Sequence, residues 1–456
     1  MQLSLIANLI TKAERRDKMA ATVEKKFTGS VLDLAKQTGI DIVQEGDVTF
    51  WQGEYGGQTK PRGPLAGKKI GCLVGSEFSD FQAYYLASYI GEFGGELEFL
   101  CVDWVVYKFT RPNIKTKGVV GMWGLTLDPI PVMGPSKHTC KNLRDADAEN
   151  YDAVVILGGH SADVIVTEIE VKDFLTAAAE NGAVIGGIGA GIMPMIRCGI
   201  MAGKACTGNR LVDYMLKKIA NFEDSAVIVD GKIITARDTV DTPAFVRAIC
   251  KTFDPDFEDH RQGILSGKTM LVIAGEDFED IELAVPVMEY IYRGAKVTLA
   301  TFTPVIRSRP PLVGLDVVQG NFGMSVPFQE IPESYYTIKK LVDVGMDDFD
   351  AIQIPGAMCP YNIVEAGTPL EFLKQADDAG KIITYICHGG IPVAAADLIK
   401  GKKATGWQAS KDSIEIMGGE YNENWAAVVD GTHVSGRTPP EIPEYVDAIM
   451  VRLLID

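Results

Sequence analysis

Short apolar runs alternate with longer amphipathic stretches along most of the chain. Residues 153–157 (AVVIL) and 269–274 (TMLVIA) read as buried parallel strands, since each is a short apolar run beside glycine or polar residues. Residues 171–182 (VKDFLTAAAENG) have a helical pattern that ends on a capping glycine. This alternation predicts a doubly wound α/β sheet with right-handed crossovers, in which ligands bind beyond the carboxyl ends of the strands.

The pattern occurs twice. Residues 69–82 (KIGCLVGSEFSDFQ) return as residues 269–282 (TMLVIAGEDFEDIE), and three later blocks return at nearly the same offset. A constant offset indicates two tandem copies of one domain. The expected boundaries are an extension at 1–66, a first copy at 67–253, a linker at 254–267 and a second copy at 268–456. The extension predicts one or two helices and then a loop rich in glycine and aromatic residues, which would form packing or oligomer surface.

The two copies differ most at the turn after the strand at residues 382–386 (IITYI). The second copy reads CHGG at residues 387–390, where the first reads GAGI at residues 189–192. A nucleophile followed by small residues between a strand and a helix is typical of a nucleophile elbow. The helix N-terminus beyond the turn would favour the thiolate of Cys387. The alternative is an ordinary buried cysteine beside a surface histidine, His388.

A nucleophilic thiol needs a partner that handles protons. Glu282 opens an apolar helix at the same sheet edge, whereas the first copy has Gln82 there and Ser79 in place of Glu279. The first copy therefore lacks thiol, histidine and carboxylate together, which predicts an inactivated duplicate.

Both copies resemble the ThiJ/PfpI superfamily, which holds the parkinsonism-associated deglycase and glyoxalase III. The matching segments are FEDIE at 278–282, FDAIQIPGA at 349–357, ICHGG at 386–390, and the later VVDG and SGR stretches. The resemblance implies two tandem flavodoxin-like (class I glutamine amidotransferase-like) doubly wound parallel-sheet domains. It also implies a Cys387 nucleophile, its neighbour His388, and a Glu282 carboxyl that hydrogen-bonds the sulfur. An oxyanion site would involve Gly356, Ala357 and Gly389.

Two departures from the family pattern raise further hypotheses. The family's GGRAPE loop reads GAMCPY at residues 356–361, so its arginine and glutamate are missing. Asp163 of the first copy could replace that glutamate across the domain interface and orient His388, or it could be an exposed loop acid.

Trp407 would form either a pocket wall or core packing. Cys359 would either line the pocket or resolve an oxidised Cys387.

The leading functional reading is a cofactor-independent cysteine enzyme that acts on a small electrophilic carbonyl, with glyoxalase III or deglycase chemistry. One alternative is a cysteine hydrolase or hydratase of a small amide, peptide or isonitrile. Another is a redox-sensing or chaperone-like protein that uses oxidation of Cys387. A class I glutamine amidotransferase is disfavoured, because no acid lies two residues from the late histidine, His433.

Amino-acid composition limits the classes of binding partner that the chain is expected to have. The formal charge of −17 disfavours nucleic acid and anionic membranes, which leaves a small-molecule substrate, pairing of the two domains and a homo-oligomer as expectations. Eight dispersed cysteines form neither a disulfide framework nor a zinc site, and no metal site is expected. The N-terminus lacks the features of a signal peptide, so a cytoplasmic location is expected.

Overall fold

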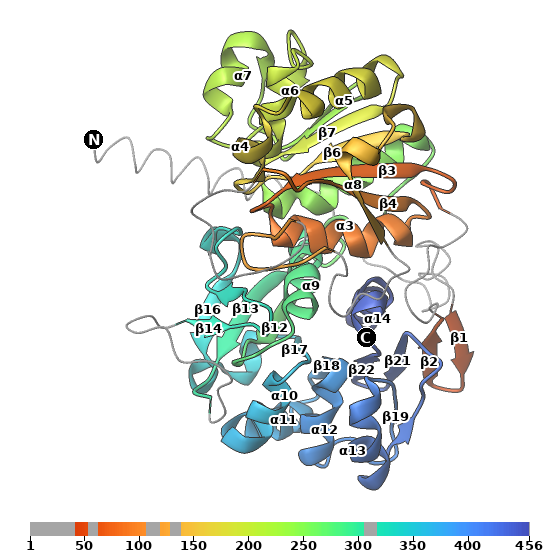
Figure 1. Cartoon of the computed structure of the whole chain (residues 1–456). Helices are drawn as coiled ribbons and strands as arrows, with labels where there is room; N and C mark the ends of the chain where they lie inside the picture. Colours follow the sequence, from red (N-terminus) through yellow and green to blue (C-terminus); the bar gives the residue numbers. More distant parts are fainter. Residues whose placement is uncertain (1–41, 53–62, 106–118, 128–137, 305–316, 456) are drawn as a thin grey trace.

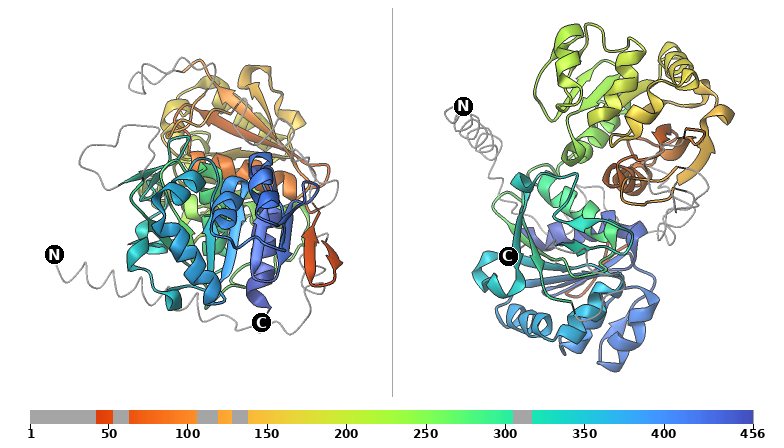
Figure 2. Two further views of the ribbon diagram at one scale, coloured as in Figure 1. Left: turned by 90° about the horizontal axis from the view of Figure 1, so that it is seen from below. Right: turned by 60° about the vertical axis from the view of Figure 1, so that its left-hand side comes forward.

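The computed structural model of the chain contains two α/β units, one above the other in Figure 1 and turned in Figure 2. It describes residues 42–52, 63–105, 119–127, 138–304 and 317–455. Each unit is a mostly parallel sheet covered by helices on both faces, so the tandem doubly wound fold is confirmed.

The sheet of the first unit has the order β10-β11-β7-β6-β3-β4-β5 and is parallel except for β10. Its strands are β3 (Lys69–Gly75), β4 (Glu96–Val102), β5 (His138–Asn142), β6 (Ala153–Ile156), β7 (Val184–Ile188), β10 (Val227–Asp230) and β11 (Ile233–Ala236). Its helices are α3 (Asp80–Glu92), α4 (Ser161–Ile165), α5 (Ile169–Glu180), α6 (Met193–Arg197), α7 (Asp213–Ile219) and α8 (Thr242–Phe253). The central strands are buried along almost their whole length, as their apolar runs predict.

The second unit repeats this order, with β21-β22-β18-β17-β12-β13-β16. Its strands are β12 (Thr269–Ile273), β13 (Lys296–Thr301), β16 (Thr337–Lys340), β17 (Ala351–Ile354), β18 (Ile382–Ile386), β21 (Ala427–Asp430) and β22 (His433–Gly436). Its helices are α9 (Asp280–Tyr292), α10 (Cys359–Ala366), α11 (Thr368–Asp378), α12 (Gly390–Ala395), α13 (Lys411–Ile416) and α14 (Ile442–Leu454). The parallel order places the ends of β12, β17 and β18 side by side, and these ends carry the candidate site.

The end of the N-terminal extension joins the second unit. Strands β1 (Ile42–Glu45) and β2 (Val48–Trp51) form a hairpin, and β2 pairs antiparallel with β21. The loop expected from residue 50 onward is therefore wrong at Phe50 and Trp51, which are buried in β2. The missed signal is the turn at Gly46, whose φ of +61° suits glycine between two short alternating runs. The helices expected earlier in the extension lie outside the described residues.

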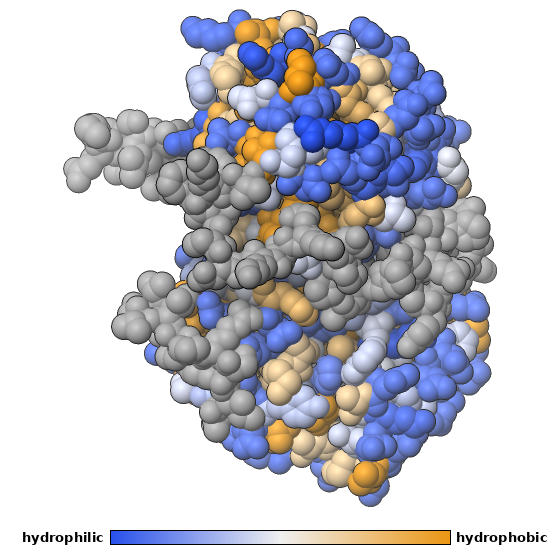
Figure 3. Space-filling view, in the orientation of Figure 1, coloured by the Kyte–Doolittle hydropathy of each residue, from blue (hydrophilic) through white to orange (hydrophobic). Residues whose placement is uncertain are grey.

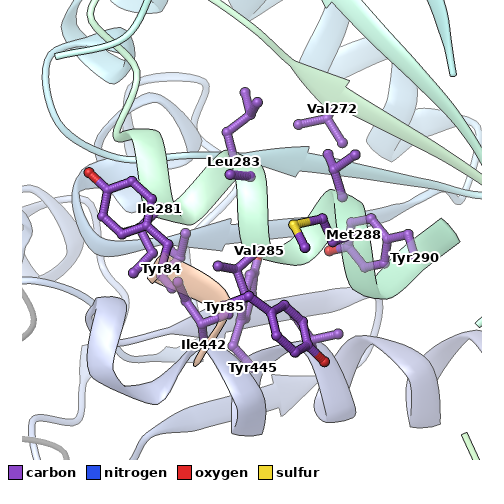
Figure 4. Packing of buried hydrophobic residues seen from close by; sticks show 14 of the residues in the cluster. Tyr84, Tyr85, Val272, Ile281, Leu283, Val285, Met288, Tyr290, Ile442 and Tyr445 are labelled. Carbon is purple, nitrogen blue, oxygen red and sulfur yellow. The ribbon is translucent and has the colours of Figure 1, made fainter. Parts of the chain in front are cut away.

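One hydrophobic cluster extends across both units. Helix α3 of the first unit packs on α9 and α14 of the second, and Figure 4 shows the buried side chains between them. Tyr84 and Tyr85 come from α3, Val285 from α9, and Ile442 and Tyr445 from α14. Each copy therefore completes the core of the other.

Buried charges cross the same interface. Glu289 on α9 pairs with Arg247 on α8 at 2.8 Å and with Arg293 at 2.9 Å, and Arg293 also pairs with Asp447 on α14 at 2.6 Å. Arg261, after α8, pairs with Asp447 at 2.8 Å. Because each buried charge has a partner, loss of any one would leave another uncompensated.

The outer surface is largely hydrophilic. Hydrophilic residues predominate over both units on the face shown in Figure 3. Among the described residues, no helix is long and apolar enough to cross a membrane.

Candidate active site

Cys387 occupies a sharp turn at the end of β18. Its φ is +60°, a left-handed conformation that is uncommon outside glycine, and its side chain is only 8% exposed. The turn is tight: a Cβ on Gly389 would lie 2.7 Å from the carbonyl oxygen of Ile354. The chain then enters α12 at Gly390. The backbone thus has the elbow geometry that the CHGG segment predicts.

Three elements meet at the sulfur. His388 Nδ1 lies 3.2 Å from Cys387 Sγ, and the Glu282 carboxyl from α9 hydrogen-bonds the sulfur. Gly356, after β17, makes this meeting possible. A Cβ there would lie 2.6 Å from Glu282 Oε2 and 3.0 Å from Cys387 Sγ. The structure therefore brings Cys387, His388, Glu282 and Gly356 together.

Glu282 is held in place by backbone and side-chain contacts. Its side chain is fully buried, and Oε2 accepts a hydrogen bond from the Gly356 N–H at 2.6 Å. The Gln353 side-chain amide donates to the Glu282 carbonyl at 2.8 Å, which fixes this turn of α9. Within the described part of the chain, Oε1 is buried without a hydrogen-bond partner, so one half of this carboxyl is left unsatisfied.

Burial controls the protonation of the site. It raises the pKa of Glu282 to about 8, so the carboxyl keeps its proton at neutral pH and can donate it. Burial lowers the pKa of His388, which leaves the imidazole neutral and able to accept a proton.

The thiolate expected from the helix N-terminus is wrong for the resting site. Burial, and then the charges of Glu282 and Glu279, raise the pKa of the Cys387 thiol. The hydrogen bond from the backbone N–H of His388 lowers this pKa but only partly opposes them. The resting site is a thiol beside a neutral imidazole and a protonated carboxyl, so His388 must take the thiol proton during reaction.

The expected oxyanion site changes in one respect. The Gly356 N–H is occupied by Glu282, so it is not free for a substrate oxygen. Ala357 follows with a φ of +56°, and the next amide, that of Met358, donates to Asp277 O at 3.0 Å. Within the described part of the chain, the Ala357 N–H has no recorded acceptor, which makes it the better oxyanion donor of the pair.

A cavity of about 360 Å³ adjoins the elbow. Its lining residues are Gly406, Trp407, Gln408, Tyr421, Glu423, Asn424, Arg437 and Thr438. The backbone N–H of Trp407 donates to Cys387 O at 3.0 Å, and its indole is 40% exposed, so Trp407 forms pocket wall and not core. Arg437 is a lining residue that the sequence reading did not single out. Its place in the matching SGR stretch, opposite Arg237 of the first copy, was the available signal.

Two candidates remain, Cys359 and Asp163. Cys359 is fully buried at the start of α10, where a Cβ on Gly275 would meet its Sγ at 2.8 Å; burial raises its thiol pKa to about 12. No disulfide or contact with Cys387 is recorded for it among the described residues. Asp163 lies exposed on α4. The contacts recorded for the His388 ring are with Cys387 and, at 6.1 Å between ring centres, with Tyr361. The pairing of Asp163 with His388 stays a prediction.

The duplicated sheet and the elbow define a class of doubly wound α/β proteins that present a cysteine at a strand-to-helix turn. The chain belongs to the DJ-1/PfpI family, whose sequence profile matches residues 68–252 and 268–452.

Relatives in this family share about a quarter of their residues with the chain. Protein DJ-1 homolog D of Arabidopsis thaliana is 26% identical over 320 residues, which cover 68% of this chain and 79% of that protein. Deglycase PfpI of Pyrococcus furiosus is 27% identical over 173 residues, which cover 38% of this chain and 92% of that protein. The crystal structure of Drosophila melanogaster DJ-1beta is 22% identical, covers 39% of this chain and 86% of its own, and has a TM-score of 0.33.

Proposed function

We propose that the chain is a cofactor-independent cysteine enzyme that converts a small α-oxoaldehyde, or its adduct, at Cys387, His388 and Glu282. One observation carries the proposal: a buried thiol at a left-handed turn lies between a neutral imidazole and a protonated carboxyl. The name of the Pyrococcus furiosus relative, a deglycase, supports this class of substrate.

The groups present suffice for the first step. As Sγ attacks the aldehyde carbon, its proton passes to His388 Nδ1, which lies 3.2 Å away. The electron pair of the C=O bond moves to oxygen, which takes the proton of Glu282, and the product is a thiohemiacetal. The Ala357 N–H would stabilise the developing negative charge. No step requires an oxidant or a reductant.

The test measures loss of methylglyoxal and formation of its 2-hydroxy acid by the full chain. Cys387→Ser should abolish both, whereas Cys359→Ser should retain both, because the fully buried Cys359 packs against Gly275. Activity retained by Cys387→Ser would refute the nucleophile assignment. Turnover of amides and esters with none of methylglyoxal would favour the hydrolase alternative instead.

A further inference from the structure

Glu279 is a second buried acid, one helical turn before Glu282. The residue is 3% exposed, and its Oε1 has no hydrogen-bond partner among the residues that the structure describes. Glu279 occupies the N-cap position of α9, yet its side chain makes no capping hydrogen bond. A buried polar group left unpaired costs about 1–3 kcal/mol. The fold therefore leaves one oxygen of this carboxyl unsatisfied.

The first copy shows what the same helix start requires. Ser79 occupies the matching N-cap of α3, and its hydroxyl accepts a hydrogen bond from the Gln82 N–H at 3.2 Å. A short hydroxyl thus satisfies this turn. The second copy has a larger acid that does not cap the helix, which points to a chemical role for Glu279.

Glu279 lies beside the reacting atoms. Its backbone N–H donates to Gly356 O at 3.3 Å, and Gly356 is the residue against which Glu282 and Cys387 meet. A charge on Glu279 would raise the pKa of the Cys387 thiol, so the two groups are within electrostatic reach. The site therefore places two carboxyls near one sulfur.

The titratable groups around Glu279 are acids and neutral donors. They are Asp280 and Glu282 on α9, Cys387 on the elbow, and Tyr84 on α3 of the first copy. Burial, and then the charges of Glu282 and Asp280, raise the pKa of Glu279, which favours its protonated form.

A substrate with two adjacent carbonyl oxygens can use two acids. After the thiohemiacetal forms, the hydrogen on the former aldehyde carbon must move to the neighbouring carbon. That shift passes through an enediol, in which the second oxygen also carries a proton. An amide or an ester has only one such oxygen and needs only one acid.

We propose that Glu279 is the second acid of this site and donates its proton to the second carbonyl oxygen of a 1,2-dicarbonyl substrate. The Glu282 carboxylate takes the C–H proton, whose electron pair forms the C=C bond, while the second C=O pair moves to oxygen and breaks the Glu279 O–H bond. On collapse, Glu282 delivers its proton to the neighbouring carbon, and the first hydroxyl returns a proton to Glu279. The product is a thioester of Cys387, with Glu279 protonated, Glu282 a carboxylate and the thiol proton still on His388. A water molecule then attacks the thioester carbon, gives one proton to Glu282 and releases the 2-hydroxy acid, while the departing thiolate takes the proton of His388. The inference rests on the proposed function.

The test compares Glu279→Gln and Glu279→Ser with the wild type in two assays. For methylglyoxal, kcat should fall about 100-fold, as loss of a general acid predicts, with KM changed by less than about 2-fold. The rate of Cys387 alkylation by iodoacetamide at pH 7 should stay within about 2-fold of the wild-type rate. A neutral side chain replaces a protonated carboxyl, so the electrostatic potential at the sulfur does not change. The serine variant guards against misfolding, since serine caps the matching helix in the first copy.

Wild-type turnover in both variants would overturn the role of Glu279, as would equal losses of turnover and alkylation, which indicate a structural effect. A wild-type chain that does not convert methylglyoxal would overturn the proposed function itself, and this inference with it. The two failures are thus distinguishable.

Discussion

The two copies hold the same backbone with different side chains at the elbow and beside it. Gly189 and Cys387 take nearly the same φ, +55° and +60°. Gln82 Oε1 accepts from the Gly158 N–H at 2.7 Å, just as Glu282 Oε2 accepts from Gly356. The copies differ at the other end of this side chain. Gln82 Nε2 donates to a threonine hydroxyl at 2.9 Å, whereas Glu282 Oε1 has no hydrogen-bond partner among the described residues. An unsatisfied acid next to a thiol is thus what separates the two.

An acid of the second copy binds beside the helix start of the first copy. Glu330, from the loop after β15 (Ser325–Val326), contacts the Ser79 hydroxyl and accepts hydrogen bonds from Trp123 Nε1 at 2.8 Å and Thr239 Oγ1 at 3.3 Å. The structure thus records an acid that crosses from the active copy to the degenerate one, the reverse of the direction proposed for Asp163. Polar groups around the start of α3 in the first copy thus bind the neighbouring unit.

The largest expected effect comes from giving the second elbow the residue of the first. Cys387→Gly should lower turnover about 10⁴-fold or more, because the nucleophile is removed. The melting temperature should hold or rise, since glycine adopts a φ of +60° without strain. The reciprocal variant Gly189→Cys should confer no activity on the first copy, which has neither the histidine nor the acid. Detectable turnover by Cys387→Gly would refute the comparison.

A second change tests how the copies hold each other. At matching positions they carry opposite charges, Arg247 and Asp447, and Asp447 lies against Arg261 and Arg293. Asp447→Asn should destabilise the chain by about 3 kcal/mol, because it leaves two buried arginines short of an acid. Denaturant unfolding measures this. Lys374→Met, which removes an exposed pair with Glu371, is the control and should change stability by less than about 1 kcal/mol.

A third change converts the active acid into the amide of the first copy. Glu282→Gln should lower kcat about 100-fold, because an amide cannot donate the proton. Wild-type activity should fall as pH rises through about 8, the pKa of Glu282, and this alkaline fall should vanish in the variant. Gln82→Glu in the first copy is the matched control and should leave turnover unchanged. An alkaline limb that persists in Glu282→Gln would assign it to another group.

Periodicity and internal repetition were sufficient to predict the fold, because strand spacing and glycine stops repeat in both copies. The elbow was also predictable, since Cys387 stands where the first copy has glycine. The protonation state was not: burial at Cys387 outweighs the helix N-terminus, and burial depends on packing between distant segments. The contact of Glu330 with the first copy could not be predicted either. Glu330 lies in a loop that carries no motif, and its partner Trp123 belongs to the other unit.

The smallest expected effect concerns that contact. Burial raises the pKa of Glu330 to about 7, against an ordinary value near 4.5, so the folded chain holds a proton that the unfolded chain releases. The stability from this proton is complete below about pH 4.5 and is lost as pH rises through 7. Glu330→Gln keeps the shape and does not titrate, so it should flatten the fall in melting temperature between pH 5 and 8 and change stability at pH 5 by only about 1 kcal/mol. Glu333→Gln, at a nearby acid of the same loop, should leave the wild-type slope in place. A slope that survives in Glu330→Gln would show that other carboxyls set the pH dependence. The contact between Glu330 and the first copy would then not depend on the Glu330 proton.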